Sequence, residues 1–289
     1  MDVLVGTEAG LLDAASGRPV AFGGQEVSAV ADGWVVVGRR QLCARDGTPG
    51  PSLTAPPITC VDSRPGQEPL VGTAEAHLYR MGDEPSRLHA FDLAEGRGRW
   101  YTPWGGPPDV RSLCTAPTGT ILVNVHVGGI LRSADDGASW AATIDLHHDV
   151  HQVLALSGGR AVAACAHGLA TSHDDGVSWA LHDDGLHATY SRAVAVSGDA
   201  VLVTTSTGPQ GGEAAVYRRP LGGGAFERCQ AGLPARLEGN VDTFWLAGSE
   251  DGVAAFATRS GEVYVSTDEG GTWEQAASGL PAVRCVLLD

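Results

Sequence analysis

Short apolar runs separated by turns dominate the hydrophobic pattern of the chain. Residues 110–116, 120–126 and 129–133 form three such runs, and the same arrangement returns between residues 150 and 172. Runs of this length, bounded by Gly, Pro, Asp and Asn, are typical of short β-strands. The pattern therefore predicts units of successive antiparallel strands that are repeated along the chain.

One eight-residue motif accompanies these units. It reads Ser-x-Asp-x-Gly-x-Ser/Thr-Trp and occupies residues 133–140, 172–179 and 266–273. The first two copies start 39 residues apart and the third starts 94 residues later, which fits two further repeats of about 47. A period near 40 with several short strands per unit is the sequence signature of a β-propeller. We expect the Asp to accept backbone N–H groups within a tight turn, the Gly to adopt a positive φ, and the Trp to fill the gap between neighbouring blades.

The repeated motif resembles the Asp box of the BNR repeat family, which includes sialidase-like, photosystem II assembly factor-like and sortilin-like propellers. The resemblance implies that each copy joins the third and fourth strands of a blade and serves folding rather than catalysis. Combined with the apolar runs, it predicts an all-β, seven-bladed propeller with four-stranded antiparallel blades in a single domain over residues 1–289. The run at residues 282–288 is expected to pair with residues 3–6, so that the two ends of the chain close blade one and remove open sheet edges.

The charge balance excludes some classes of partner. The formal net charge is -15, and all 19 basic residues are Arg. A strongly acidic surface repels nucleic acids and anionic membranes. The N-terminal residues contain neither a basic stretch nor a long apolar run, which predicts a cytoplasmic protein without a secretory signal, and we expect a monomer. The six cysteines form no Cys-x-x-Cys pair, so reduced and buried thiols are expected.

Candidate chemistry gathers where inner strands begin, which in a propeller is around the central opening. Aligning the blades, with inner strands expected at residues 192–196 for blade six and 241–247 for blade seven, places one polar residue at the equivalent position of every blade. These residues are Ser28, Thr59, Arg111, His151, Arg192, Asp242 and Arg284. Like charges crowded together cost energy unless a ligand compensates, so the set predicts a functional site.

The arginines predict an anion site. Arg111, Arg192 and Arg284 suit a carboxylate, phosphate or sulfate, because guanidinium groups bind such anions in a bidentate manner. Sialidases carry an arginine triad on a similar propeller, and this resemblance implies an anion clamp without implying sialic acid as the ligand. Further substrate contacts are expected from loop residues near the same opening. They are Arg259, Tyr190 and Trp104.

The histidines leave two alternatives open. His126, His148 and His151 could bind a divalent transition metal, although no tight His-x-His or His-Glu-x-x-His spacing supports a metal site. Without a metal, His151 and His126 could act as general acid and base, with Asp242 orienting one of them. The sequence thus predicts a hydrolase or lyase acting on a small anion. The competing hypothesis is a non-catalytic propeller that binds proteins or assists assembly.

Overall fold

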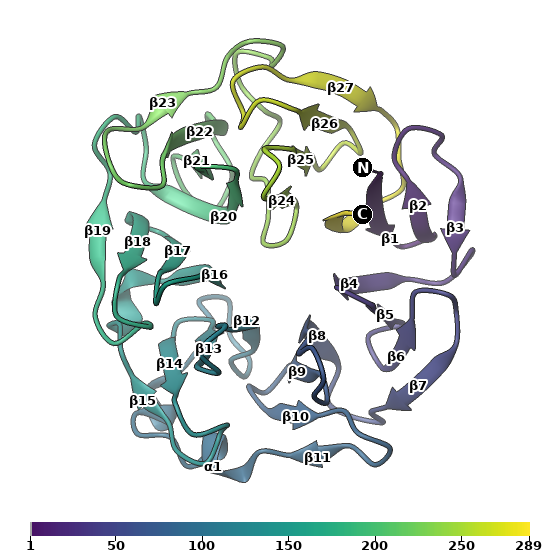
Figure 1. Cartoon of the computed structure of the whole chain (residues 1–289), viewed down its shortest axis with the longest axis vertical. Coiled ribbons are helices and arrows are strands. Elements are labelled where there is room, and N and C mark those ends of the chain that lie inside the picture. Colours follow the sequence, from purple (N-terminus) through teal and green to yellow (C-terminus); the bar gives the residue numbers. More distant parts are fainter. Residues whose placement is uncertain (1) are drawn as a thin grey trace. The chain divides into compact units, whose positions relative to one another are not determined.

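The computed structural model describes residues 2–289, and these residues form seven sheets of four strands each. The predicted seven-bladed propeller with four-stranded antiparallel blades is confirmed (Figure 1). Blade one contains β28 (Val283–Leu288), β1 (Val3–Thr7), β2 (Gly10–Asp13) and β3 (Pro19–Ala21). Blade two contains β4 (Val27–Ala31), β5 (Trp34–Val37), β6 (Gln41–Ala44) and β7 (Pro49–Ser52). Blade three contains β8 (Ile58–Asp62), β9 (Leu70–Thr73), β10 (Leu78–Arg80) and β11 (Ser86–Arg87).

The remaining blades follow the same order from the inner to the outer strand. Blade four contains β12 (Val110–Thr115), β13 (Ile121–Val125), β14 (Gly129–Ser133) and β15 (Ala141–Ala142). Blade five contains β16 (Val150–Ala155), β17 (Ala161–Cys165), β18 (Gly168–Ser172) and β19 (Ala180–His182). Blade six contains β20 (Tyr190–Ser197), β21 (Ala200–Ser206), β22 (Ala215–Pro220) and β23 (Glu227–Arg228). Blade seven contains β24 (Leu246–Gly248), β25 (Ala254–Ala257), β26 (Val263–Ser266) and β27 (Glu274–Ala277).

Helical structure is confined to connections. The helix α1 (His89–Asp92) and the 3-10 helix η1 (Arg97–Arg99) lie between blades three and four, and η2 (Leu146–His148) precedes blade five. None of the helices within residues 2–289 has the length and apolar character needed to cross a membrane.

The chain divides into two compact units. One unit contains the residues up to Val27 together with Ala164–Leu169 and His182–Asp289, and the other contains Ser28–Ala163 and Ala170–Leu181. Blades one, six and seven belong to the first unit. Blades three and four belong to the second unit, as does blade two apart from Val27. The strands of blade five are shared between them.

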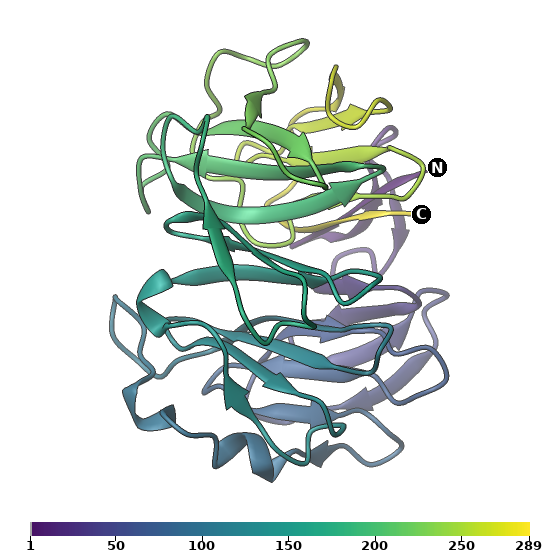
Figure 2. The ribbon, with the colours of Figure 1, turned by 60° about the vertical axis from the view of Figure 1, so that its left-hand side comes forward.

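Blade one is closed by the two ends of the chain. In the register of β1 and β28, Val3 faces Leu288 and Val5 faces Val286. The backbones of Asp2 and Asp289 add two hydrogen bonds of 3.0 and 2.9 Å beyond the strands. Figures 1 and 2 both show the chain ends next to each other in this blade. The predicted pairing of the termini is therefore confirmed, and it flanks β1 on both sides, with β28 as the inner strand of the blade.

The repeated motif forms the turn between the third and fourth strands. In the first copy the Asp135 carboxylate accepts hydrogen bonds from the Ser139 N–H at 2.9 Å and the Ser133 Oγ at 2.8 Å. Its second oxygen accepts the Ser139 hydroxyl at 2.6 Å. These bonds, the Ser139 hydroxyl first, lower the pKa of Asp135 to about 2. Gly137 has φ +86°, and an added Cβ would lie 2.6 Å from Leu88, so only glycine fits there.

The tryptophan of each motif reaches the preceding blade or connection. The Trp140 ring lies 5.0 Å from the ring of Phe91 in α1. The Trp179 indole donates to the Thr143 hydroxyl at 3.1 Å, and the Trp273 backbone N–H donates to the Ala231 carbonyl at 3.0 Å. Each motif therefore joins its turn to the element that precedes its own blade.

The inner strand of blade seven differs from the prediction. An inner strand was expected at residues 241–247, but β24 begins only at Leu246. The reason is a turn in which the Trp245 N–H donates to the Asp242 carbonyl at 3.0 Å while Phe244 adopts φ +65°. Asp242 therefore lies in a loop before the strand, and the prediction that it occupies an inner strand was wrong.

Candidate functional site

At least four of the seven aligned positions lie at β-bulges of inner strands. In blade four, Val110 pairs with Val125 and Ser112 pairs with Asn124, so Arg111 is the extra residue. The register shifts in the same way at three further aligned positions. They are Thr59, Arg192 and Arg284. Bulges occur next to functional sites because they re-aim a side chain and interrupt pairing.

Two buried histidines lie together in the unit that contains Ser28–Ala163. His126 follows β13 and is 2 % exposed, whereas His151 is the second residue of β16 and is fully buried. Their ring centroids are 6.3 Å apart. Both rings come from neighbouring blades, so the packing of blade four against blade five fixes their separation.

Each histidine lies beside a carboxylate that precedes an inner strand. The His126 Nδ1 is 3.4 Å from Asp109 Oδ1, and the His151 Nε2 is 3.5 Å from Asp149 Oδ2. The second Asp149 oxygen lies 4.0 Å from the His126 Nε2. Asp149 adopts φ +47°, a left-handed conformation that Asp tolerates better than most residues. The left-handed turn ends η2 and leads directly into β16.

The electrostatics keep both carboxylates ionised. Burial alone would raise the pKa of Asp109, but the neighbouring His126 and Arg111 lower it below its usual value. Burial likewise acts to raise the pKa of Asp149, and the nearby His151, His126 and Arg111 outweigh it, so the pKa is lowered. The cluster thus places two carboxylates against imidazole and guanidinium groups.

Arg111 and Trp104 complete this cluster. The Arg111 Nη1 lies 3.4 Å from the His126 Nδ1, and the Trp104 ring meets the His126 ring edge-on with centroids 4.6 Å apart. Trp104 is 69 % exposed, so it is the solvent-facing member of a mostly buried group. We call Asp109, Arg111, His126, Asp149 and His151, with Trp104 at the rim, the dyad cluster.

The predicted metal set is not formed. Throughout residues 2–289, no three or more His, Cys, Asp or Glu side chains are arranged to hold a metal ion. His148 ends η2, and the left-handed Asp149 separates it along the chain from His151. The imidazoles of His126 and His151 instead contact carboxylates.

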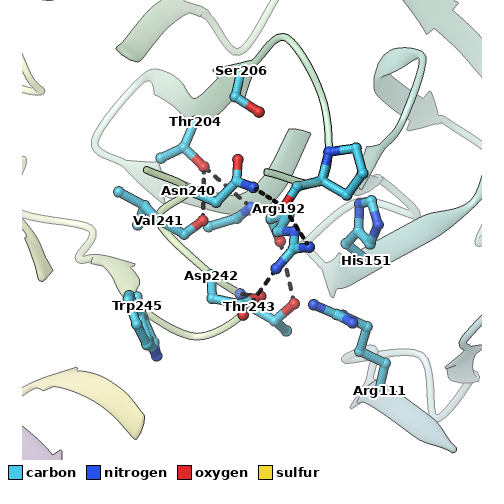
Figure 3. Close-up of polar contacts among 12 residues, drawn as sticks. Arg111, His151, Arg192, Thr204, Ser206, Asn240, Val241, Asp242, Thr243 and Trp245 are labelled. Atoms are coloured by element: carbon cyan, nitrogen blue, oxygen red, sulfur yellow. Dashed lines mark hydrogen bonds and ion pairs between the residues drawn. The ribbon is translucent and has the colours of Figure 1, made fainter. Parts of the chain in front are cut away.

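Arg192 is held by groups of its own unit (Figure 3). Its Nη1 lies 3.2 Å from Asp242 Oδ2, its guanidinium stacks 5.5 Å from the Tyr190 ring centroid, and its Nη2 donates to the Pro209 carbonyl at 3.5 Å. Burial acts to lower the pKa of Arg192, and the Asp242 carboxylate and Tyr190 more than compensate, so the pKa is raised. Asp242 therefore balances the charge of Arg192.

The other predicted arginines are placed differently. The Arg284 Nε lies 2.9 Å from the Glu26 carboxylate. Arg259 is exposed in the turn between β25 and β26. Arg192, Arg259 and Arg284 belong to one unit, whereas Arg111 belongs to the other.

Sequence reasoning missed the two carboxylates of the dyad cluster. A signal was present, because blade four begins with Asp-Val-Arg at residues 109–111 and blade five with Asp-Val-His at residues 149–151. The same spacing puts an Asp two residues before the aligned polar position in both blades. Aligning the blades one residue at a time emphasised Arg111 and His151 and overlooked the aspartates.

Comparison with known proteins identifies the architecture. No protein-family model and no curated protein matches the sequence. Solved structures do match: a virginiamycin B lyase from Staphylococcus aureus with quinupristin (TM-score 0.64, 12 % identity, 88 % of this chain and 84 % of that one), and the GH74 enzyme of Niastella koreensis (TM-score 0.60, 12 % identity, 94 % and 46 %). A structure of YCF48 bound to a D1 peptide matches with TM-score 0.52 and 15 % identity over 81 % and 74 %. At these identities the likeness shows the propeller fold alone.

Proposed function

We propose that the dyad cluster is an acid–base site for a small anionic ligand. In this proposal Arg111 holds the anion, and His126 and His151 transfer protons. The observation that carries the proposal is the pair of buried histidines, each beside its own ionised carboxylate, at 3.4 and 3.5 Å. A carboxylate beside an imidazole fixes the ring orientation and stabilises the imidazolium that forms when the ring accepts a proton.

The arrangement favours lyase or hydrolase chemistry. Proton transfer by a positioned histidine accelerates such reactions by roughly 10²- to 10⁴-fold. Two histidines allow one to remove a proton while the other protonates a leaving group, and a guanidinium beside them neutralises the charge of a bound carboxylate, phosphate or sulfate. The repeated motif supports membership of the BNR/Asp-box family, and the likeness to a virginiamycin B lyase and to GH74 enzymes is compatible with catalysis on this scaffold.

The first test is anion binding. Acetate, citrate, phosphate and sulfate are titrated by calorimetry into the wild-type protein, Arg111→Leu and Arg160→Gln. Arg160 lies in the turn before β17, so its replacement removes the same charge outside the cluster. We expect at least one anion to bind the wild type and Arg160→Gln alike and to bind Arg111→Leu at least ~10-fold more weakly, the loss of a charge-assisted hydrogen bond. Equal affinity for all three proteins would overturn the assignment of Arg111.

The second test is proton transfer. Carboxylates that bind are incubated with the protein in D2O, and deuterium incorporation at carbon is followed by proton NMR. We expect exchange that is at least ~10²-fold slower in His126→Gln or His151→Gln, the contribution of a general base. Binding that depends on Arg111 without any exchange would instead favour a non-catalytic binding propeller, the alternative that the likeness to peptide-bound YCF48 supports.

A further inference from the structure

Asn124 has a buried side-chain amide that makes no hydrogen bond to the residues the structure describes. It lies on β13, is fully buried, and neither its amide nitrogen nor its amide oxygen has a hydrogen-bond partner among residues 2–289. Leaving such a group buried and unpaired costs about 1–3 kcal/mol per group, so native proteins rarely retain one without a reason.

The side chain faces the dyad cluster side of blade four. Residues two apart on a strand share a face, so Leu122 and Asn124 of β13 point the same way. His126 follows the strand, and its N–H still donates to the Asp109 carbonyl at 2.9 Å, which continues the pairing by one residue. Leu122 packs against blade five. A Cβ atom added to Gly176 of the second repeated motif would lie only 2.6 Å from the Leu122 Cδ2. His126 also contacts blade five, through Asp149. Asn124 lies between Leu122 and His126 in the sequence, so its side chain also points toward blade five.

Blade six shows what this position does when its role is structural. Thr204 occupies the equivalent place, since Leu202, two residues before it, contacts Gly270 of the third motif as Leu122 contacts Gly176. The Thr204 hydroxyl accepts the Ala193 N–H and donates to the Val241 carbonyl, both at 3.3 Å (Figure 3). Thr204 thus links two blades at the bulge.

In blade four another residue makes the link. Ser112, which pairs with Asn124 across the sheet, accepts the Val153 N–H of blade five at 3.0 Å. The connection between the blades is therefore complete without Asn124. A structural role does not explain why an amide, rather than an apolar side chain, stands there.

We propose that Asn124 is a specificity-determining residue that hydrogen-bonds a neutral polar group of the ligand. The inference rests on the proposed function, in which Arg111 holds the anion. Arg111 and Ser112 are adjacent, and Ser112 faces Asn124, so the anion and the neutral group lie close together. The amide both donates and accepts, which matches a hydroxyl or amide. The ligand class is a small carboxylate that carries a hydroxyl or amide group.

Stability supplies a test that needs no ligand. Asn124→Leu keeps the number and branching of side-chain heavy atoms and removes the unpaired amide. We expect its melting temperature to rise by about 2–4 °C, because replacing unpaired buried polar atoms by apolar ones is neutral or stabilising. The matched change in blade six, Thr204→Val, should lower the melting temperature by a similar amount, since it orphans two backbone groups. Asn124→Val is the second variant in case Leu is too large. A fall in melting temperature for both Asn124 variants would assign Asn124 to the fold and overturn the proposal.

Matched ligand pairs test the specificity. Lactate with propionate, malate with succinate, and 3-hydroxybutyrate with butyrate differ by one hydroxyl group, and each is titrated by calorimetry. In at least one pair we expect the hydroxy acid to bind the wild type at least ~10-fold more tightly, and Asn124→Leu to bind both members equally. Equal binding within every pair, with affinity still lost in Arg111→Leu, would overturn the role of Asn124 and leave the anion site intact. Failure of all six to bind would overturn the role of Asn124, and only the failure of acetate, citrate, phosphate and sulfate as well would overturn the anion site.

Discussion

Blades four and six both have a β-bulge in the inner strand, but the side chains around the two bulges differ in their contacts. Both inner strands carry an arginine at a bulge, Arg111 and Arg192. In blade six the arginine is matched by Asp242 and Tyr190, and Thr204 satisfies the backbone around the bulge. In blade four the arginine lies beside His126, and the amide of Asn124 on the adjacent strand has no hydrogen-bond partner among residues 2–289. The difference indicates that one bulge is devoted to stability and the other retains polar groups that stability does not require.

The largest effect should come from the ion pair of blade six. The side chain of Arg192 is only 16 % exposed, and Asp242→Asn removes the carboxylate that pairs with it. We expect the free energy of unfolding, measured by urea denaturation, to fall by about 2 kcal/mol, less than for a fully buried pair because Asp242 is partly exposed. Asp251→Asn, at an exposed turn, is the control and should change stability by less than about 0.5 kcal/mol. Similar values for the two variants would remove the contrast between the blades.

The carboxylates of blade four should show a pH-dependent effect of intermediate size. Their pKa values are lowered by folding, so they stabilise the protein above the unfolded value of about 3.9 and lose this contribution as the pH falls through the folded value. Asp109→Asn and Asp149→Asn should each cost about 1 kcal/mol at pH 7 and almost nothing near pH 2. Denaturation curves of wild type and variants across this range measure it. A deficit that is independent of pH would show that the carboxylates act through packing rather than charge.

The smallest effect concerns the aromatic partners. Tyr190→Ala removes the ring over which Arg192 stacks, and we expect the free energy of unfolding to fall by about 0.5 kcal/mol. Trp104→Ala should change the free energy of unfolding by less than about 0.5 kcal/mol, because the residue is 69 % exposed and its ring meets the His126 ring in a T-shaped arrangement. Thermal denaturation of the two variants side by side decides the matter. A larger loss for Trp104→Ala would make the rim of the dyad cluster a structural element.

The fold was predictable because its signals are local. The repeated motif contains its own hydrogen bonds, and its spacing reports the blade length. Together with the resemblance to the Asp box, this was enough to predict seven blades and the pairing of the termini. The prediction of the inner strand of blade seven was wrong because Phe244 adopts a positive φ, in a turn that delays the start of the strand. Nothing in the apolar pattern of residues 241–247 reveals such a turn.

The candidate site was predictable only in part. The aligned positions pointed to Arg111 and His151, but the partners of a side chain depend on neighbouring strands rather than on its own. Asp242 was expected to orient a histidine, and the structure shows an ion pair between its carboxylate and Arg192. Asn124 stands in an otherwise apolar run, and its isolation becomes visible only when Ser112 and Thr204 are seen to make the links between blades.

The pairing of β1 with β28 must be a late step in the folding of this protein. Strands β1 and β28 are separated in the sequence by the six other blades, so Val3 can pair with Leu288 only after all of these blades have been synthesised. Contacts between residues so far apart in the sequence form slowly, because the entropy of closing a long loop is lost before the contacts can stabilise the chain. A circular permutant that joins Asp289 to Asp2 and opens the chain in an exposed turn would make this pairing a local hairpin. Such a permutant should fold faster than the natural chain order while keeping the same blades.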